Sequence, residues 1–417
     1  MRTYRELFRT PEFTPLFLTA AATVAAQTVS GLGLATLIYA ATGSPLLSAL
    51  AMFGPSLAQV VGATVLLSAA DRLPPRAALS LLALAFAVGT AALALPGLAV
   101  GAAFGVVLAL GVLGSLGGGV RYGLLNEVLP RDGYLLGRSV FNMAAGAMQI
   151  CGFATGGILV TALSPRGTLL TGAALYAAAA LCARCGLSRR PPRATGRASA
   201  RATWRTNALL WSSRPRRYTF LVLWVPNGLI VGCESLYVPY APRNAGLLFA
   251  CAALGMLAGD IVTGRFVPAH WRSRLRLPLN LLLAAPYLAF ALDPSLPVAV
   301  AAVVLSSAGY SASLLHQERL MALTPDELSG HALGLHASGM LTMQGVGAAL
   351  AGAVAQWTSP ADAMALVSTV SVAVALGLAY ADRPGRGPAQ ESRSTASATR
   401  SSDAVSATRT KRSPAGP

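Results

Sequence analysis

Long apolar segments without a charged residue are the feature that most constrains this chain. No Asp, Glu, Lys or Arg occurs between Phe13 and Ala70, or between Ala77 and Val120. Further runs of this kind cover residues 139–165, 167–183, 277–292, 294–316 and 332–361. A helix needs about 20 predominantly apolar residues to cross a bilayer, at a rise of about 1.5 Å per residue. The number and length of these runs therefore predict a protein that crosses a membrane many times.

The composition agrees with this interpretation. Hydrophobic residues make up 54% of the chain and charged residues only 11%, whereas soluble domains carry roughly 25% charged residues. So few charges do not cover a water-exposed surface, which argues against a soluble enzyme. The net charge is +17, but the basic residues lie between the apolar blocks rather than in one compact domain. This distribution argues against a nucleic-acid partner.

Turn signals at residues 42–45 and 96–97 divide the longest runs. Lipid offers no hydrogen-bond partner to the backbone, so only helices or closed barrels cross it. Continuous Ala, Leu, Gly and Val runs lack the alternation of a barrel strand. We therefore expect an all-α membrane protein with twelve transmembrane helices, near 16–40, 46–70, 77–95, 98–120, 139–163, 168–187, 218–238, 245–264, 277–292, 296–315, 332–356 and 361–380.

Arginines in the connections predict the orientation. They concentrate before the first helix and in the second-to-third and fourth-to-fifth connections, at Arg2, Arg5, Arg9, Arg72, Arg76, Arg121, Arg131 and Arg138. The alternate connections hold only Arg166 and Arg243. Basic residues favour the cytoplasmic side, so both termini are expected there, in a multi-pass protein of the plasma membrane. The first apolar stretch has no cleavage-like boundary, and we interpret it as an uncleaved helix rather than a signal peptide.

Four segments are expected along the chain. Residues 1–187 form a six-helix bundle, 188–217 a basic cytoplasmic linker, 218–380 a second six-helix bundle, and 381–417 a disordered cytoplasmic tail. The linker contains nine arginines and no acidic residue, which favours contact with anionic lipid; a regulatory docking site is the alternative. Its apolar residues, Trp204 and 208–211, predict a short helix on the membrane surface.

Several motifs resemble the major facilitator superfamily, and in particular its drug/proton antiporter branch of the actinobacterial type. The connection after the second helix keeps Asp71, Arg72 and Arg76 of the pattern G-x-x-x-D-R-x-G-R-R, but has Pro74-Pro75 in its second half. An aspartate followed by an arginine recurs at the end of the eighth helix, as Asp260 and Arg265. Other similar stretches are Arg-Thr-Pro-Glu-Phe at 9–13, Thr-Gly-Ser-Pro-Leu-Leu at 42–47, Glu-Ser-Leu-Tyr-Val-Pro-Tyr-Ala at 234–241, Leu-Thr-Pro-Asp-Glu-Leu at 323–328 and Gly-Met-Leu-Thr-Met-Gln-Gly at 339–345.

The resemblance implies two six-helix bundles that rock about a central site, and a cytoplasmic gate. A carboxylate at Asp71 that pairs with arginines across the bundle interface would hold the cytoplasmic side shut. The gating candidates are Asp71, Arg72, Arg76, Arg121, Arg138, Asp260 and Arg265. The fifth helix also contains Gly152-x-x-x-Gly156-Gly157, which resembles the antiporter motif of the family without its proline; close helix packing is the alternative reason for these glycines.

Glu234 is the candidate for proton coupling. It is expected well inside the seventh helix, where a carboxylate is costly by ~2.5–3.5 kcal/mol and normally faces a cavity or a partner. Burial would favour proton exchange near neutral pH. Pairing with Arg243 at the outer end of the helix is the alternative.

Four amides are expected at similar depth, roughly 15–18 Å from the cytoplasmic ends of their helices. They are Gln27, Gln149, Asn227 and Gln344. Amides at this depth either join helices or line a binding site. Adaptable apolar walls for such a site are expected from Tyr310, Met340 and Met343, with Phe153 nearby.

The sequence thus predicts a secondary transporter, specifically a proton-coupled exporter of hydrophobic or amphiphilic small molecules. The alternatives are an uptake facilitator for a small polar solute and a transport-inactive sensor or scaffold. We expect small-molecule cargo, protons and the lipid bilayer as partners, a monomer, and no cofactor or metal. Four histidines without a metal-site or nucleophile motif argue against an enzyme. Cys182-x-x-Cys185 lacks a second ligand pair and is interpreted as structural.

Overall fold

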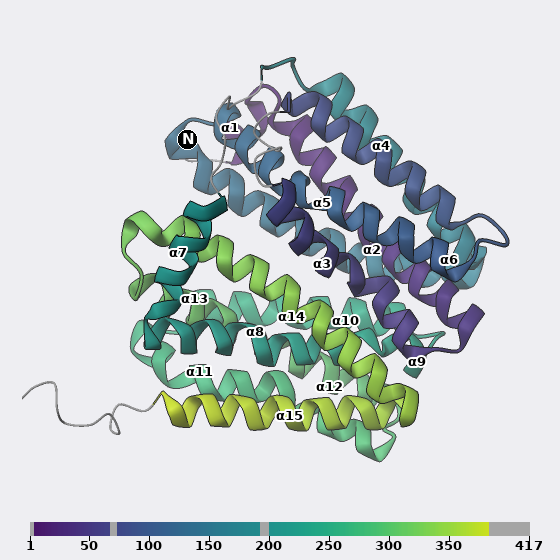
Figure 1. The fold of residues 1–417 in the computed structure, drawn as a ribbon, viewed down its shortest axis with the longest axis vertical. Helices are drawn as coiled ribbons and strands as arrows, with labels where there is room; N and C mark the ends of the chain where they lie inside the picture. Colours follow the sequence, from purple (N-terminus) through teal and green to yellow (C-terminus); the bar gives the residue numbers. More distant parts are fainter. Residues whose placement is uncertain (1–3, 67–72, 192–199, 383–417) are drawn as a thin grey trace, which may run out of the picture. The chain divides into compact units, whose positions relative to one another are not determined.

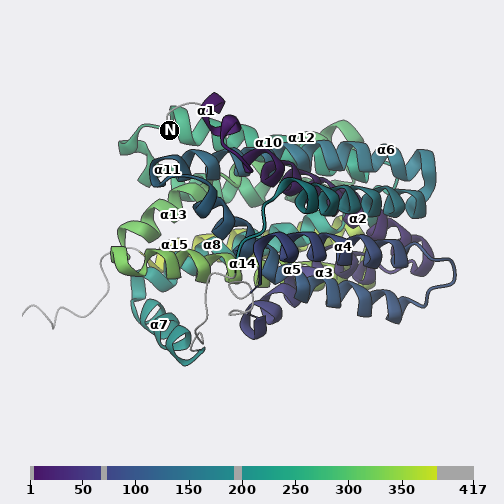
Figure 2. The same ribbon diagram turned by 90° about the horizontal axis from the view of Figure 1, so that it is seen from above.

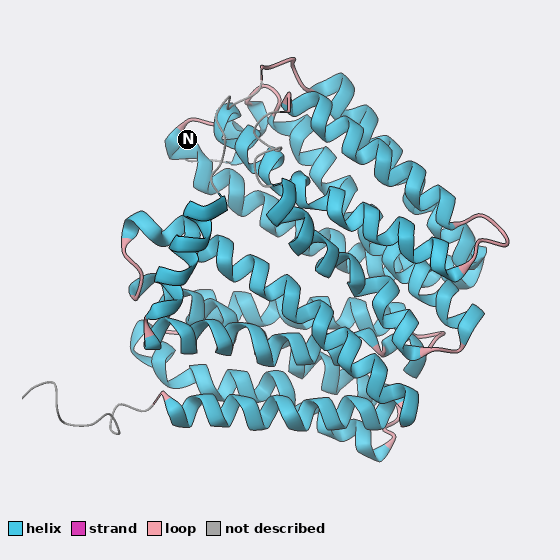
Figure 3. Cartoon of the chain, in the orientation of Figure 1, coloured by secondary structure: helices cyan, strands magenta, loops and turns pink. Residues whose placement is uncertain are grey.

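The structure is a computed structural model that describes residues 4–66, 73–191 and 200–382. Within these ranges it consists of helices joined by short loops, without a strand (Figure 3). The first part of the chain forms α1 (Tyr4–Arg9), α2 (Phe13–Thr42), α3 (Pro45–Leu66), α4 (Pro75–Leu93), α5 (Val100–Val128) and α6 (Arg131–Gly186). The second part forms α7 (Ala200–Ser212), α8 (Arg214–Ser235), α9 (Tyr237–Tyr240), α10 (Ala245–Phe266), α11 (Ala269–Ala284), η1 (Ala285–Leu292), α12 (Leu296–Gly309), α13 (Ala312–Ala322), η2 (Asp326–Leu328), α14 (Ser329–Trp357) and α15 (Pro360–Ala381).

The described part of the chain contains 11 helices that are long and apolar enough to cross a membrane. The expectation of an all-helical membrane protein is therefore confirmed. One of the 11 covers 51 residues, Leu136–Gly186. Its backbone leaves helical geometry at Ser164, with φ 82° and ψ 162°. The fifth and sixth predicted helices are thus the two parts of α6, separated at Ser164.

Proline and glycine set several helix boundaries, as the turn signals predict. α2 ends at Gly43, whose φ of 64° lies in the left-handed region and whose N–H donates to the Tyr39 carbonyl at 2.8 Å. Pro75 begins α4, where its missing N–H is not needed. The ninth predicted helix, 277–292, was placed too late: the helix begins at Ala269 and continues as η1 to Leu292. Arg272, Arg274 and Arg276 lie in its first turns, so a rule based on charge-free runs excluded that part.

The helices pack in two groups. α2 packs on α6, α4 on α5 and α6, and α3 on α5; α8 packs on α14, α10 on α12, and α11 on α12 and α13. In Figure 1 the first group is purple to blue and the second is teal to yellow. α7 contacts α8 and α14 and lies at the same end of the bundle as α13 (Figure 2). The predicted short helix in the linker is thus present.

Close contacts join the two groups at one end, which we call the junction end. Gly157 of α6 lies against Gly246 of α10, so tightly that a Cβ on Gly157 would meet the Gly246 Cα at 2.9 Å. Phe153 stacks on Phe249 with ring centroids 4.6 Å apart. On the other side, α3 packs along α14. Here the Gln356 amide donates to the Ser44 hydroxyl.

The opposite end of the first group carries the start of α2 and α4 and the end of α5 and α6. We call it the arginine end, because Arg76, Arg121, Arg184 and Arg190 lie there. A salt-bridge network closes part of this end. Arg190 lies 3.1 Å from Glu12 and 3.3 Å from Glu127, and the Ser188 hydroxyl donates to Glu12 at 2.7 Å. The chain that leaves α6 is thereby fixed to α2 and α5.

Candidate functional site

A cavity of about 520 Å³ lies among α2, α3, α4, α5 and α6 and reaches α14. We call it the central cavity. Its wall is largely apolar, with Met52, Phe86 and Leu341 among the lining residues. This volume falls within the range of pockets that hold small molecules, roughly 300–1,000 Å³.

A few polar groups interrupt this wall. α2 presents Thr19, Thr23, Gln27 and Ser30, and Gln59 faces the cavity from α3. Such sparse polar groups in an apolar wall orient an amphiphilic ligand without demanding one exact structure. No carboxylate lines the cavity among the described residues, and Arg121 is its one charged lining residue there.

Arg121 marks the arginine end of the cavity. Its guanidinium lies 5.1 Å from the centre of the Tyr122 ring, and Arg138 lies over the same ring at 5.6 Å. Cation–π contacts of this kind orient a guanidinium without neutralising its charge. The buried Nε of Arg121 has no hydrogen-bond partner among the described groups. Two of the predicted gating arginines therefore meet at one tyrosine beside the cavity.

The four amides predicted to share one site do not meet. Gln27 lines the central cavity. Asn227 is buried and donates to the Met340 sulfur at 3.0 Å, and it shares a small second cavity with Tyr310. Gln149 is exposed.

Residues Met343 and Gln344 of α14 are partly buried. The backbone of Met343 packs against Gly228, where α8 and α14 approach closely. Neither residue is among those that line the central cavity. Met340, Asn227 and Tyr310 thus form a cluster in the second helix group, separate from Gln27 in the first.

Glu234 lies near the end of α8 and is partly buried. The described residues offer it no ion pair, so the alternative of a pair with Arg243 is not realised. Its surroundings are phenolic. Tyr237 and Tyr287 share a hydrogen bond between their hydroxyls, and both phenols, with that of Tyr310, lie within electrostatic range of the carboxylate.

The remaining gating candidates are spread over both groups. One carboxylate oxygen of Asp260 is buried without a hydrogen-bond partner in the described part of the chain. Arg265 is exposed at the end of α10, and Arg76 lies at the start of α4. Asp71 and Arg72 fall outside the described residues.

The glycines of the fifth predicted helix serve packing in this structure. A Cβ on Gly152 would meet Thr28 at 2.9 Å, and one on Gly156 would meet Leu32 at 3.4 Å. Both neighbours belong to α2, and Gly157 forms the contact with α10 at the junction end. The motif therefore lets α6 contact α2 and α10 closely.

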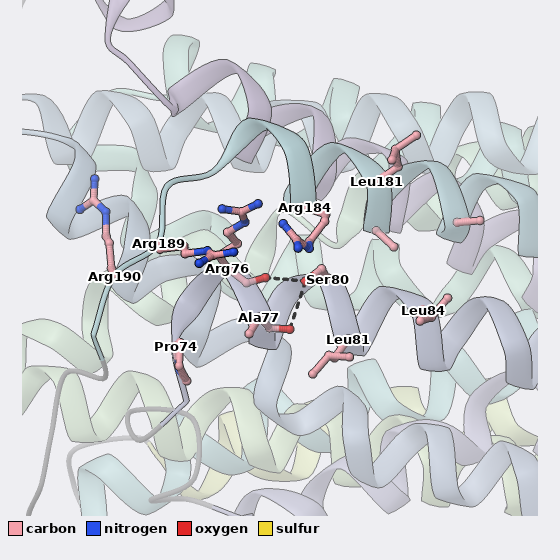
Figure 4. A pocket seen from close by; sticks show the side chains of 12 residues that line it. Pro74, Arg76, Ala77, Ser80, Leu81, Leu84, Leu181, Arg184, Arg189 and Arg190 are labelled. Atoms are coloured by element: carbon pink, nitrogen blue, oxygen red, sulfur yellow. Dashed lines mark hydrogen bonds between the residues drawn. The ribbon is translucent and has the colours of Figure 1, made fainter.

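Another pocket lies outside both the central cavity and the small cavity beside Asn227. It has a volume of about 750 Å³, runs between α4 and the last part of α6, and combines leucines with arginines (Figure 4). We call it the α4–α6 groove. Leu81 and Leu181 in its wall are each 64% exposed, which places the groove on the outer surface of the first helix group.

Several of these features were missed from sequence alone. Gln59 lies in an apolar run and belongs to no motif, so it was not among the residues expected to line a cavity. Its position one helical turn after Pro55 was the signal that could have indicated it. The buried Asn280 amide lies 3.0 Å from the His316 ring nitrogen, but the two residues are 36 positions apart. The Tyr237–Tyr287 pair joins residues 50 positions apart. Such pairs depend on helix packing, which one sequence does not display.

Comparisons with known proteins agree on the fold. A family model for the Major Facilitator Superfamily matches residues 16–313. A POT family transporter in complex with 5-aminolevulinic acid is similar in structure, with a TM-score of 0.70, 13% identity, and coverage of 88% of this chain and 95% of that one. A bacterial homologue of the human lysosomal transporter Spinster, inward-facing and unoccupied, has a TM-score of 0.64 and 15% identity. The match covers 91% of this chain and 96% of that one.

A mutant of the nucleoside transporter NupG gives a TM-score of 0.70 with 12% identity, covering 89% of this chain and 98% of that one. A comparison with curated proteins gives no match. At such low identities the solved structures inform on the fold alone.

Proposed function

Because this chain belongs to the major facilitator superfamily, we propose that it is a proton-coupled exporter of hydrophobic or amphiphilic small molecules that works by alternating access. The membership makes it a transporter rather than an enzyme. What we propose beyond the family membership is the direction of transport, the coupling ion and the class of cargo. It acts as a monomer in the plasma membrane.

The central cavity is the observation that supports this proposal. About 520 Å³ of largely apolar space lies among helices that close together at the junction end and extends to Arg121 at the arginine end. With the arginine end in the cytoplasm, cargo enters from the cytoplasm or the inner leaflet. The release step requires the junction end to open and the arginine end to close.

Twelve crossings and two six-helix bundles fit the fold if α6 crosses the membrane twice. At about 1.5 Å per residue, its 51-residue candidate span extends about 75 Å, more than twice the ~30 Å hydrocarbon core. The kink at Ser164 lies near the middle of this length. Both termini are then cytoplasmic, as the arginine distribution predicts. The bundles comprise residues 1–187 and 218–380.

Glu234 is the proposed proton carrier. It has no ion-pair partner among the described residues, and the Tyr237 and Tyr287 hydroxyls beside it supply groups that donate and accept protons. A carboxylate without a cation partner is free to bind and release a proton as its exposure changes. Its place outside the central cavity implies that coupling acts through helix movement rather than by direct competition with cargo.

The wall of the central cavity also indicates which cargo is preferred. A carboxylate is the group that pairs with a lipophilic cation, and the described lining offers none. Neutral or acidic amphiphiles fit better, because Arg121 can pair with an acidic group while the apolar wall receives the rest. An uptake facilitator for a polar solute would favour more charged groups than the single arginine among the described lining residues.

Transport by purified protein in proteoliposomes with an imposed pH gradient tests the proposal. The probes are anilinonaphthalene sulfonate (acidic), Nile red (neutral) and ethidium (cationic). We expect gradient-driven accumulation of the first two. Glu234→Gln keeps a hydrogen-bonding group of similar size but removes titration, so it should abolish gradient-driven accumulation while exchange of the probe without a gradient continues.

The matched control is Glu327→Gln, since Glu327 is exposed at the surface and should transport as the unchanged protein does. Accumulation that survives in Glu234→Gln would assign coupling to another group or ion. Binding of every probe without flux would favour the sensor or scaffold alternative.

A further inference from the structure

The α4–α6 groove carries a charge pattern that transport of cargo through the central cavity does not use. Figure 4 shows the guanidinium groups of Arg76, Arg184 and Arg189 gathered at one end of the groove, while Leu81, Leu84 and Leu181 continue along the two helices. The groove therefore has a cationic end and a long apolar side.

Among the described residues, carboxylates neutralise only one arginine of the cationic end. Arg190 also borders the groove, but its guanidinium forms salt bridges with Glu12 at 3.1 Å and with Glu127 at 3.3 Å. None of the other three arginines forms an ion pair with a carboxylate within the described ranges. Three unneutralised guanidinium groups close together repel one another, so their arrangement favours an anion between them.

The apolar side of the groove faces lipid rather than protein. Leu81, Leu84 and Leu181 are 64%, 49% and 64% exposed. Ala177 and Ala180 also line the groove. Leucines and alanines together offer apolar surface that an acyl chain can cover.

We propose that the α4–α6 groove binds one anionic phospholipid of the leaflet at the arginine end. Its phosphate lies among the guanidinium groups of Arg76, Arg184 and Arg189, and an acyl chain lies along Leu81, Leu84 and Leu181. Arginine suits this role because its planar donors match phosphate oxygens and its charge persists at every physiological pH. The polar head and apolar tail are both required, which distinguishes this ligand from free phosphate and from neutral lipid.

Titration of the delipidated full-length protein with single lipids, followed by native mass spectrometry, tests the proposal without any transport assay. One molecule of phosphatidylglycerol should bind tightly to each protein, and we call it the tight copy. Phosphatidylcholine should bind more weakly. Arg184→Gln/Arg189→Gln removes two charges and leaves Arg76, a gating candidate, unchanged. It should weaken phosphatidylglycerol binding roughly twentyfold or more, since each arginine near a membrane surface contributes about fivefold.

The matched control is Arg217→Gln/Arg274→Gln, which removes the same charge from exposed positions in α8 and α11. It should leave the tight copy unchanged. Ala177→Trp fills the groove without changing charge and should abolish the tight copy, whereas Ala178→Trp, at an exposed neighbour that does not line the groove, should retain it.

Three outcomes would overturn the proposal. Equal binding of both lipids would remove the anionic requirement. An equal loss in the control pair would show only general surface charge. Displacement of phosphatidylglycerol by inorganic phosphate alone would show a simple anion site, without a role for the acyl chain. Because none of these measurements involves transport, failure here leaves the proposed function untouched.

Discussion

At the scale of single residues, Glu12 shows how a charge at the membrane boundary is used. It precedes α2 with a left-handed φ of 68°, and its side chain does not cap its own helix. Its carboxylate instead accepts hydrogen bonds from Ser188 and Arg190. Burial tends to raise the pKa of Glu12, but these hydrogen bonds outweigh burial and hold the pKa below its ordinary value of 4.5. Glu12 therefore joins the start of α2 to the chain that leaves α6, both at the arginine end.

Glu12→Gln should lower the unfolding temperature at pH 7, by a change in free energy of about 1 kcal/mol or less, as for partly exposed ion pairs. A carboxyl group whose pKa is lowered on folding stabilises the protein above its ordinary pKa. That contribution disappears as the pH falls through the folded-state pKa. The difference in unfolding temperature between the unchanged protein and Glu12→Gln should thus be largest at pH 7 and should vanish well below pH 4.5. Thermal unfolding in nanodiscs measures it.

Glu327→Gln supplies the comparison, because Glu327 is exposed and should give no difference at either pH. A deficit of Glu12→Gln that persists unchanged at acidic pH would show that the charge of Glu12 is not the cause.

At the scale of elements, α6 is the helix whose path decides the topology. Its Ser164 adopts a φ of 82° and a ψ of 162°, a region that costs a residue other than glycine roughly 1–3 kcal/mol. The hydroxyl of Ser164 accepts from the Gly167 N–H at 3.3 Å, and its carbonyl accepts from the Thr168 hydroxyl at 2.9 Å. These are the contacts of a helix N-terminus. The second part of α6 thus begins as a new helix.

Two crossings by α6 predict opposite accessibility at Arg166 and Cys185. They are 19 positions apart, which corresponds to about 28 Å along a helix. In a protein stripped of its other cysteines, Arg166→Cys should react with an impermeant maleimide on intact cells. Cys185, exposed in the structure, should react only after the membrane is permeabilised. Equal reaction of both positions on intact cells would contradict two crossings.

At the scale of the whole helix assembly, the two groups are held together at the junction end. Gly157 against Gly246, Phe153 against Phe249, and α3 along α14 make this contact. Alternating access requires these surfaces to separate once in each cycle. The two glycines permit close approach of α6 and α10, and separation there requires the Phe153 and Phe249 rings to unstack.

A disulfide across the junction end should therefore stop transport. In a cysteine-free protein, Ser44→Cys/Gln356→Cys places one thiol on each side of the junction end, at positions whose native side chains reach each other. Oxidation should abolish probe flux in proteoliposomes, and reduction should restore it, while each single substitution remains active under oxidant. Full flux through the crosslinked protein would mean that the junction end does not open during the cycle.

The sequence by itself determined the helical membrane class, the positions of most helices and the resemblance to a transporter family, because charge-free length and turn residues are local properties. It did not determine which side chains meet. Gln27 and Asn227 occur at equal depth, yet only packing places one in the central cavity and the other against Met340. Likewise, Arg76 and Arg184 are 108 positions apart in a basic chain, and only the packing of α4 on α6 places them in one groove. Depth follows from counting along one helix, whereas the direction in which a side chain points depends on how the other helices rotate and pack around it.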